Sequence, residues 1–359
     1  MPMPGGRTYD EALVDAIAAG VRHEAVEGVE GVVEEVRPSP DEPREHAIDP
    51  RVLDMTRKKI AGLIPSASAG GLMRHRHNLK ETHFVTPADV TLETPYAEFG
   101  DRAIPVTVVR PANAPEKAPV LLFLHGGGFT VGWFGVYEAF LTAVAELAGC
   151  VVVFPEVRLA PENRFPAQVD DSAEMVDWVI AHADELGVDP AKLVVSGDSA
   201  GGSLLNATCL RQADKIALAI SLYAGCDIDG IPDWWSYDLY PVVEGQHDEM
   251  VNRVDNIKAW VGETHYIGSD DSLRRNPEIS AVYASDEQLA RFPRTVVVCS
   301  EYDYLRPQDE RFAAQLAAAG VDVRLIRYAG MEHGFIEMTG VYPQAEDLAR
   351  VYVEEIGRL

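Results

Sequence analysis

The side chains best suited to a chemical reaction gather around Ser199. This serine lies in Gly-Asp-Ser-Ala-Gly at residues 197–201, between an apolar run and a helix-compatible stretch at residues 203–212. Small residues on both sides favour a sharp turn from strand to helix, because the chain must pass close to itself there. Such a turn projects the hydroxyl above the end of a sheet, at the N-terminus of a helix. The pattern predicts a nucleophile, and a glycine-rich turn that merely closes a strand is the alternative. We expect the neighbouring Asp198 to be structural.

A second motif, His-Gly-Gly-Gly at residues 125–128, follows another apolar run. Backbone amides of glycine can point at a ligand oxygen without obstruction, so we expect Gly126 and Gly127, completed by Ala200, to stabilise an oxyanion. Loss of one such donor costs on the order of 3 kcal/mol of barrier. A phosphate-binding loop is the alternative, but Gly-x-Gly-x-x-Gly and Gly-Lys-Ser/Thr are both absent from the sequence. His125 precedes the serine and is predicted to hold this loop by hydrogen bonds.

Asp303 and His333 each follow a short apolar run further along the chain. The carboxyl ends of parallel strands share one edge of a sheet, where open α/β proteins place their sites. A serine hydroxyl becomes a good nucleophile when a neutral imidazole takes its proton, and the imidazole needs a carboxylate to orient it. We therefore expect His333 to be the base of Ser199 and Asp303 to orient it. Glu301 and Asp309 are alternatives for the acid.

A sheet must bring these distant segments together, and the pattern of apolar runs predicts one. Residues 90–94 and 104–110 alternate in polarity and are expected to pair antiparallel at a sheet edge. Short apolar runs then alternate with helical patterns, which predicts an α/β fold with a mostly parallel central sheet and helices on both faces. These expected strands lie at 120–124, 151–154, 193–195, 217–222, 295–299 and 323–326.

The start of the chain differs from the rest. Apolar residues at helical spacing occur at residues 9–26 and 48–63, with an acidic, proline-containing stretch between them. We therefore divide the chain into an N-terminal helical cap segment, residues 1–75, that lies outside the sheet, and a catalytic domain, residues 76–359. Arg-His-Arg-His at residues 74–77 is predicted to be a solvated loop, because two arginines would repel a metal cation from the histidines.

The catalytic domain contains an insertion at about residues 225–290 that has no clear strand. It follows the strand after the nucleophile helix, so we expect it to lie above Ser199 as a lid, together with the N-terminal helices. Its aromatic residues either line the substrate pocket or form the ordinary core of a helix pair. The candidate pocket residues are Phe129, Trp234, Trp235 and Tyr237.

Charge and composition limit the classes of function that fit the sequence. The 359 residues carry 31 Lys and Arg against 57 Asp and Glu, a net charge of −26. Such a field repels nucleic acid and anionic membrane surfaces. The sequence contains neither a secretory signal nor a run long enough to span a bilayer, so we expect a cytoplasmic protein. Its four cysteines are predicted to be buried free thiols, with no disulfide framework and no metal site.

Five ordered motifs together resemble the hormone-sensitive-lipase-like branch of α/β-hydrolase esterases. They are His-Gly-Gly-Gly-Phe at 125–129, Arg-Leu-Ala-Pro-Glu at 158–162 with Phe-Pro-Ala at 165–167, Gly-Asp-Ser-Ala-Gly at 197–201, Asp-x-Leu at 303–305 and His-Gly-Phe at 333–335. The chain departs from that pattern at Glu156-Val157, where the family commonly has Asp-Tyr, and in the acid loop after Asp303.

The resemblance implies an α/β-hydrolase fold with a helical cap, a carboxylesterase for short- to medium-chain esters, and often a homodimer. It assigns Ser199, His333 and Asp303 to the triad and Gly126, Gly127 and Ala200 to the oxyanion hole. The reaction runs through an acyl-enzyme and needs neither a metal nor an organic cofactor. The alternatives are a non-catalytic small-molecule receptor on a hydrolase scaffold, and an amide or lactone hydrolase with the same triad.

Overall fold

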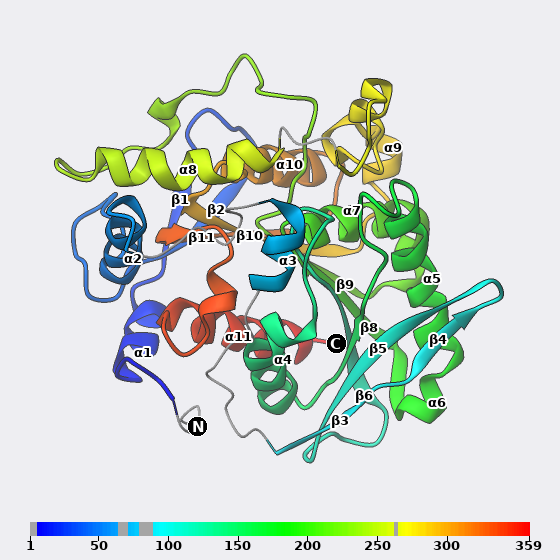
Figure 1. The fold of residues 1–359 in the computed structure, drawn as a ribbon. Coiled ribbons are helices and arrows are strands. Elements are labelled where there is room, and N and C mark those ends of the chain that lie inside the picture. The colour runs from blue at the N-terminus through cyan, green and yellow to red at the C-terminus, as the bar shows by residue number, and fades with distance from the viewer. Residues whose placement is uncertain (1–5, 64–70, 79–88, 262–264) are drawn as a thin grey trace.

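The computed structural model describes residues 6–63, 71–78, 89–261 and 265–359. Within these ranges, eleven strands form one sheet in the spatial order β1-β2-β11-β10-β9-β8-β6-β7-β5-β3, with β4 paired to β5 (Figure 1). The strands are β1 (Arg22–Ala25), β2 (Val33–Arg37), β3 (Val90–Glu93), β4 (Tyr96–Phe99), β5 (Arg102–Pro111), β6 (Ala118–Leu124), β7 (Val151–Pro155), β8 (Val188–Asp198), β9 (Leu218–Leu222), β10 (Arg294–Tyr302) and β11 (Val323–Glu332).

The middle of the sheet is parallel. From β2 through β11, β10, β9, β8 and β6 to β7, every neighbouring pair is parallel, whereas β1, β3, β4 and β5 pair antiparallel. All six predicted apolar runs lie in these parallel strands, and β3 pairs antiparallel with β5 as expected. The predicted fold class is confirmed, because strands buried on both faces have few polar positions to interrupt them.

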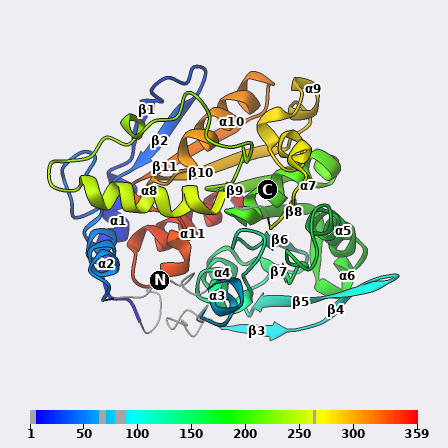
Figure 2. The ribbon, with the colours of Figure 1, turned by 45° about the horizontal axis from the view of Figure 1, so that its top comes forward.

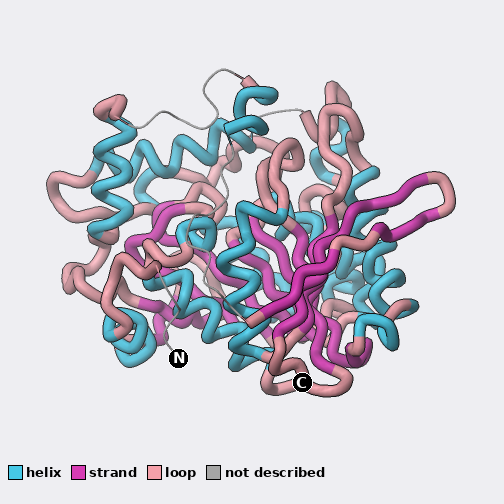
Figure 3. Tube along the Cα trace, turned by 60° about the horizontal axis from the view of Figure 1, so that its bottom comes forward, coloured by secondary structure: helices cyan, strands magenta, loops and turns pink. Residues whose placement is uncertain are grey.

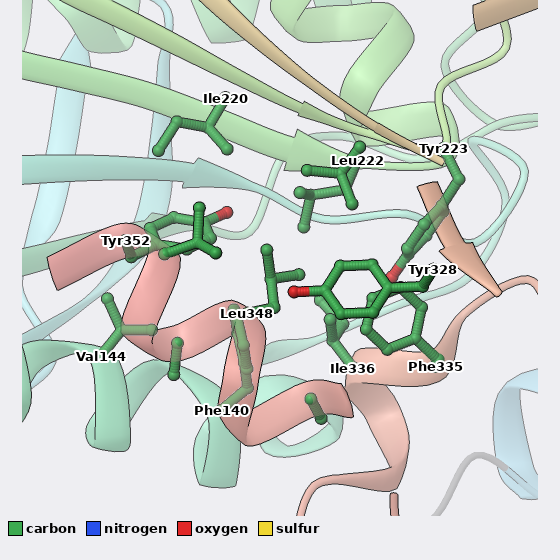
Figure 4. Close-up of a cluster of buried hydrophobic side chains, with 14 of the residues drawn as sticks. Phe140, Val144, Ile220, Leu222, Tyr223, Tyr328, Phe335, Ile336, Leu348 and Tyr352 are labelled. Carbon is green, nitrogen blue, oxygen red and sulfur yellow. The ribbon is translucent and has the colours of Figure 1, made fainter. Parts of the chain in front are cut away.

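Helices cover both faces of the sheet (Figure 3). One face packs against α1 (Ala12–Ala19), α4 (Phe134–Ala148) and α11 (Pro343–Ile356). The other packs against α5 (Ala167–Ala181), α7 (Ala200–Gln212) and α10 (Arg306–Ala318), with the short α6 (Ala183–Leu186) and α9 (Asp286–Leu289) at its margins. Figure 4 shows the first core, in which Ile220 and Leu222 of β9 face Phe140 of α4 and Leu348 of α11. Burying such side chains is the main force that holds the layers together.

The N-terminal segment enters the sheet, so the prediction that residues 1–75 lie outside it is wrong for β1 and β2. The strand β2 pairs in parallel with β11. Both glutamates of β2 are buried. Burial of their charges is possible because each has an arginine partner: Glu34 binds Arg327 at 3.0 Å and Glu35 binds Arg324 at 2.8 Å. In the sequence these acidic residues indicate solvent, whereas in the fold their charges are paired across the sheet edge.

Three helices lie above the carboxyl ends of the strands. They are α2 (Pro50–Ile60) and α3 (Leu72–Asn78) from the N-terminal part and α8 (His247–Val261) from the insertion. Figure 2 shows α8 crossing the sheet with α2 beside it, and Arg57 of α2 binds Glu249 of α8 at 2.6 Å. The N-terminal helices therefore join the insertion as predicted, while the domain boundaries stay a prediction.

Two further sequence expectations concern cysteines and membrane spans. Cys150, Cys209, Cys226 and Cys299 are free and buried, which confirms the thiol prediction. In the described parts of the chain, every helix is too short or too polar to cross a bilayer. The 3₁₀ turns are Ala213–Lys215, Tyr237–Leu239, Asp271–Arg275, Ala281–Tyr283 and Phe335–Met338.

Candidate active site

Ser199 occupies the sharp turn between β8 and α7. Its backbone has φ 52° and ψ −120°, a region that side chains rarely adopt. The flanking glycines make the turn feasible, since a Cβ on Gly201 would lie 2.0 Å from the carbonyl oxygen of Leu124. A Cβ on Gly197 would lie 2.4 Å from the Gly201 carbonyl oxygen. The strained serine at a strand end, followed at once by a helix, has the geometry of a nucleophile elbow.

The structure brings Ser199, His333 and Asp303 into one hydrogen-bonded line. Nε2 of His333 lies 2.8 Å from Oγ of Ser199, and Nδ1 lies 2.6 Å from Oδ2 of Asp303. Asp303 is fully buried, and its other oxygen accepts the Leu305 amide at 3.0 Å. Three loops that follow β8, β10 and β11 therefore meet at one edge of the sheet. The line permits a proton to pass from the serine to the imidazole.

The surroundings of His333 favour its protonated form. Burial lowers the pKa of the imidazole, but the charge of Asp303 and its hydrogen bond raise it, and the net pKa lies above the ordinary value of 6.5. Asp198 and Glu337 contribute further negative charge. The imidazolium that forms when Ser199 loses its proton is thus stabilised by the protein.

The two alternative acids have other partners. Glu301 contacts Nδ1 of His46 at 2.8 Å and accepts the Gly330 amide at 2.7 Å. Asp309 is fully buried beside the thiol of Cys226, at 3.5 Å. Asp303 is the carboxylate that contacts His333.

The amide of Gly126 is not free, and its predicted role in the oxyanion hole is wrong. It donates to Oδ1 of Asp198 at 2.7 Å and lies 3.1 Å from the hydroxyl of Tyr137. Asp198 is buried, and burial raises its pKa to about 6. By accepting the Gly126 amide, Asp198 joins the glycine loop to the turn at Ser199. This agrees with the structural role predicted for Asp198. His125 also holds this loop, since its Nδ1 donates to the Gly126 carbonyl at 2.8 Å.

Three backbone amides are the candidate donors of the oxyanion hole, and Gly128 supplies one of them. Gly127 and Gly128 have φ +105° and +58°, and the Gly127 carbonyl accepts the Thr130 amide at 3.0 Å, which closes a tight turn. Within the described residues, the amides of Gly127, Gly128 and Ala200 donate no hydrogen bond. Sequence reasoning missed Gly128, although its place in the glycine run was a usable signal.

Comparison with known proteins agrees with this geometry. A family model described as the alpha/beta hydrolase fold matches residues 121–337. Esterase LipI of Mycobacterium tuberculosis is 28% identical over 265 residues, which cover 72% of this chain and 78% of the relative. Ethyl acetate hydrolase of Pseudomonas putida is 30% identical over 266 residues, with 70% and 78% covered.

A solved structure leads to the same result. The hyperthermophilic esterase of the archaeon Pyrobaculum calidifontis matches with a TM-score of 0.75 at 27% identity, over 86% of this chain and 98% of the other. The chain belongs to the α/β-hydrolase fold family. Within that family it is a hormone-sensitive-lipase-like esterase, which confirms the resemblance drawn from its motifs.

The aromatic residues predicted to line the pocket of the esterase pack against other side chains, and their place in the pocket stays a prediction. The ring of Phe129 stacks on Tyr266 of the insertion at 3.8 Å. Trp234 lies under the guanidinium of Arg311 in α10 at 3.9 Å. Trp235 and Tyr237 contact each other at 4.9 Å, and Lys258 lies over both rings. The Phe129 contact joins the end of the glycine loop to the insertion. Trp235 also lies 5.4 Å from the ring of Tyr304, the residue after Asp303.

A different aromatic residue of the esterase lies over the glycine loop. Atom Cε3 of Trp260, near the end of α8, is 3.2 Å from the place of a Cβ on Gly128. The ring of His75 lies 5.2 Å from the Trp260 ring. His75 belongs to helix α3, so the prediction of a solvated loop at residues 74–77 is wrong. The side chain of His77 lies outside the described residues.

Proposed function

We propose that this esterase hydrolyses short- to medium-chain carboxylic esters with Ser199 as nucleophile, His333 as general base and acid, and Asp303 as the group that orients His333. The observation that carries the proposal is the line of two short hydrogen bonds, 2.8 Å and 2.6 Å, through the imidazole. The name of one relative, ethyl acetate hydrolase, supports small esters as substrates.

The first half-reaction forms an acyl-enzyme. Oγ of Ser199 attacks the ester carbonyl carbon while its proton passes to Nε2 of His333. Asp303 keeps the other ring nitrogen protonated and stabilises the imidazolium. The tetrahedral intermediate then collapses, the carbon–oxygen bond to the alcohol breaks, and His333 gives its proton to the leaving oxygen.

The second half-reaction releases the acid. His333 takes a proton from water, and the hydroxide attacks the acyl carbon of the ester bond to Ser199. When that intermediate collapses, the proton returns to Oγ and the carboxylic acid leaves. In both halves the negative oxygen is bound by the amides of Gly127, Gly128 and Ala200, each worth on the order of 3 kcal/mol of barrier.

Hydrolysis of p-nitrophenyl acetate and butyrate tests the proposal. We expect wild-type protein to release p-nitrophenol, and S199A to lose this activity while keeping its melting temperature. S272A, a serine on the exposed surface of the insertion, is the matched control. Undiminished turnover by S199A would reject the assignment. Ligand binding without turnover of any ester, amide or lactone would favour a receptor instead.

Two finer expectations belong to the same proposal. The four buried free thiols support a cytoplasmic location, where the reducing environment preserves them.

The homodimer is supported by what is common among proteins with these motifs. Light scattering behind size exclusion measures the assembly directly, and a mass of 39.3 kDa at micromolar concentration would reject the dimer.

A further inference from the structure

Helix α3 is fastened to the glycine loop by Arg76. Its guanidinium donates to the carbonyl oxygens of Thr130 and Ala160, each at 2.7 Å, and pairs with Glu162 at 2.8 Å. Thr130 lies in the turn that begins at Gly127. The helix therefore has a fixed place relative to the amides that bind the oxyanion, because charge-assisted bonds of one planar group set both distance and orientation.

The lid helix α8 meets α3 at this point. Trp260 of α8 contacts His75 of α3 at 5.2 Å with the rings tilted by 55°, and its indole touches the position of Gly128. Figure 1 shows α3 beside the end of α8. The indole of Trp260 thus lies over the glycine loop, with the ring of His75, 185 residues away in the sequence, packed against it. We call Trp260 and His75 the roof pair.

The imidazole of His75 has an unused polar atom. Its Nδ1 is buried and has no hydrogen-bond partner among the residues that the structure describes. Burial lowers the pKa of His75, so the ring is neutral at pH 7 and Nδ1 either donates or accepts. A buried polar atom without a partner is costly, and native proteins retain few of them. A partner supplied by the substrate would remove that cost.

We propose that the roof pair determines substrate specificity: the Trp260 indole limits the size of the group beneath it, and Nδ1 of His75 binds a hydroxyl on the ester. The proposal rests on the ester hydrolysis proposed above. The preferred substrates are then small esters that carry a hydroxyl group. A hydroxyl can donate to Nδ1 of one tautomer of the imidazole or accept from Nδ1 of the other. His75 and Trp260 act on binding and selectivity, and the reacting atoms belong to the triad.

Matched pairs of esters test the hydrogen bond. The acyl side is probed with p-nitrophenyl 3-hydroxybutyrate against p-nitrophenyl butyrate, and the alcohol side with 2-hydroxyethyl butyrate against propyl butyrate. In at least one pair, H75F should lower kcat/KM for the hydroxylated member about tenfold and leave the plain member within about twofold. An equal change in both members of both pairs, or no change at all, would overturn the role of His75.

Chain length tests the indole. We expect W260A to raise the ratio of kcat/KM for p-nitrophenyl octanoate over butyrate by about tenfold, because space opens above the glycine loop. A ratio of two substrates on one enzyme sample does not depend on the fraction of protein that is folded. An unchanged ratio would overturn the role of Trp260.

A control on the same helix separates specificity from general disturbance. The side chain of Met73 is 72% exposed, and M73A should leave every substrate ratio as in wild type. Failure of the two proposals is distinguishable. If wild-type protein turns over none of these esters, the proposed function fails, whereas turnover with unaltered ratios in H75F and W260A rejects the roof pair alone.

Discussion

Nδ1 of His46 lies 2.8 Å from Oε1 of Glu301, and this contact joins the N-terminal segment to the strand that leads to the catalytic acid. The other oxygen of Glu301 accepts the amide of Gly330, three residues before His333, at 2.7 Å. Arg327 lies 3.2 Å from the same carboxylate. One buried carboxylate therefore connects the N-terminal segment with β10, which leads to Asp303, and with β11, which leads to His333.

Replacing that carboxylate should destabilise the fold. Glu301 is 2% exposed, and E301Q would leave Arg327 without one of its negative partners in the interior. We expect the free energy of unfolding to fall by about 2 kcal/mol, because the buried Arg327 loses the charge of one carboxylate partner and keeps Glu34. Urea denaturation measures it. E45Q, on an exposed neighbour of His46, should change it by less than about 0.5 kcal/mol, and equal losses in the two variants would contradict the argument.

Two buried aspartates should differ sharply in their effect on catalysis. D303N removes the charge that orients His333, and we expect kcat to fall about 10⁴-fold without unfolding. Burial and the nearby charge of Asp303 raise the pKa of Asp309 well above its usual range, which favours the neutral carboxyl. D309N keeps the shape of that neutral group, and since Asp303 is the carboxylate that contacts His333, kcat of D309N should stay within about twofold of wild type. If D303N and D309N lower kcat by similar factors, the assignment of Asp303 as the catalytic acid is contradicted.

The activity should rise with pH through a midpoint above 6.5. His333 must be neutral to accept a proton, and the negative charges around it raise its pKa. Glu337 is one of them; burial and the charge of Asp198 raise its own pKa to about 7. E337Q removes a charge that favours imidazolium, so the midpoint of kcat/KM should move to lower pH, by about half a unit.

A profile of kcat/KM between pH 5 and 9 measures this shift. E287Q on the exposed surface of α9 is the control and should leave the midpoint in place. A midpoint that moves upward, or one that E287Q moves equally, would show that Glu337 does not act on His333.

The parallel strands and the triad could be predicted because their signals are local. Each strand is a short apolar run, and Ser199, Asp303 and His333 all follow directly at strand ends. The topology of parallel strands then brings these ends together without any knowledge of side-chain contacts. Comparison with known proteins confirms the family and the fold on which that reasoning depends.

The errors arose where a distant partner changes the meaning of a residue. An acidic residue such as Glu34 ordinarily indicates a position exposed to solvent. In the fold it is paired with Arg327, 293 positions away. The glycine run predicts a free amide at Gly126, but in the fold this amide donates to Asp198 at 2.7 Å. His75 lies between two arginines, and only the fold shows that one of them, Arg76, binds carbonyl oxygens.

Arg76 should control how well the roof pair covers the site. R76A removes the bonds to Thr130, Ala160 and Glu162, so α3 loses its attachment to the glycine loop. We expect KM for p-nitrophenyl butyrate to rise about tenfold, and backbone amides of residues 72–78 to exchange hydrogen faster. The triad does not contact Arg76, so kcat should change less than KM.

Arg74, one position before His75 on the same helix, provides the matched control. Its side chain is exposed, and R74A removes the same amount of charge without touching the glycine loop. Exchange rates and KM should therefore stay as in wild type. If R74A and R76A raise KM alike, the effect is one of net charge on a protein that already carries −26, and the attachment through Thr130 and Ala160 is not what holds α3 over the site.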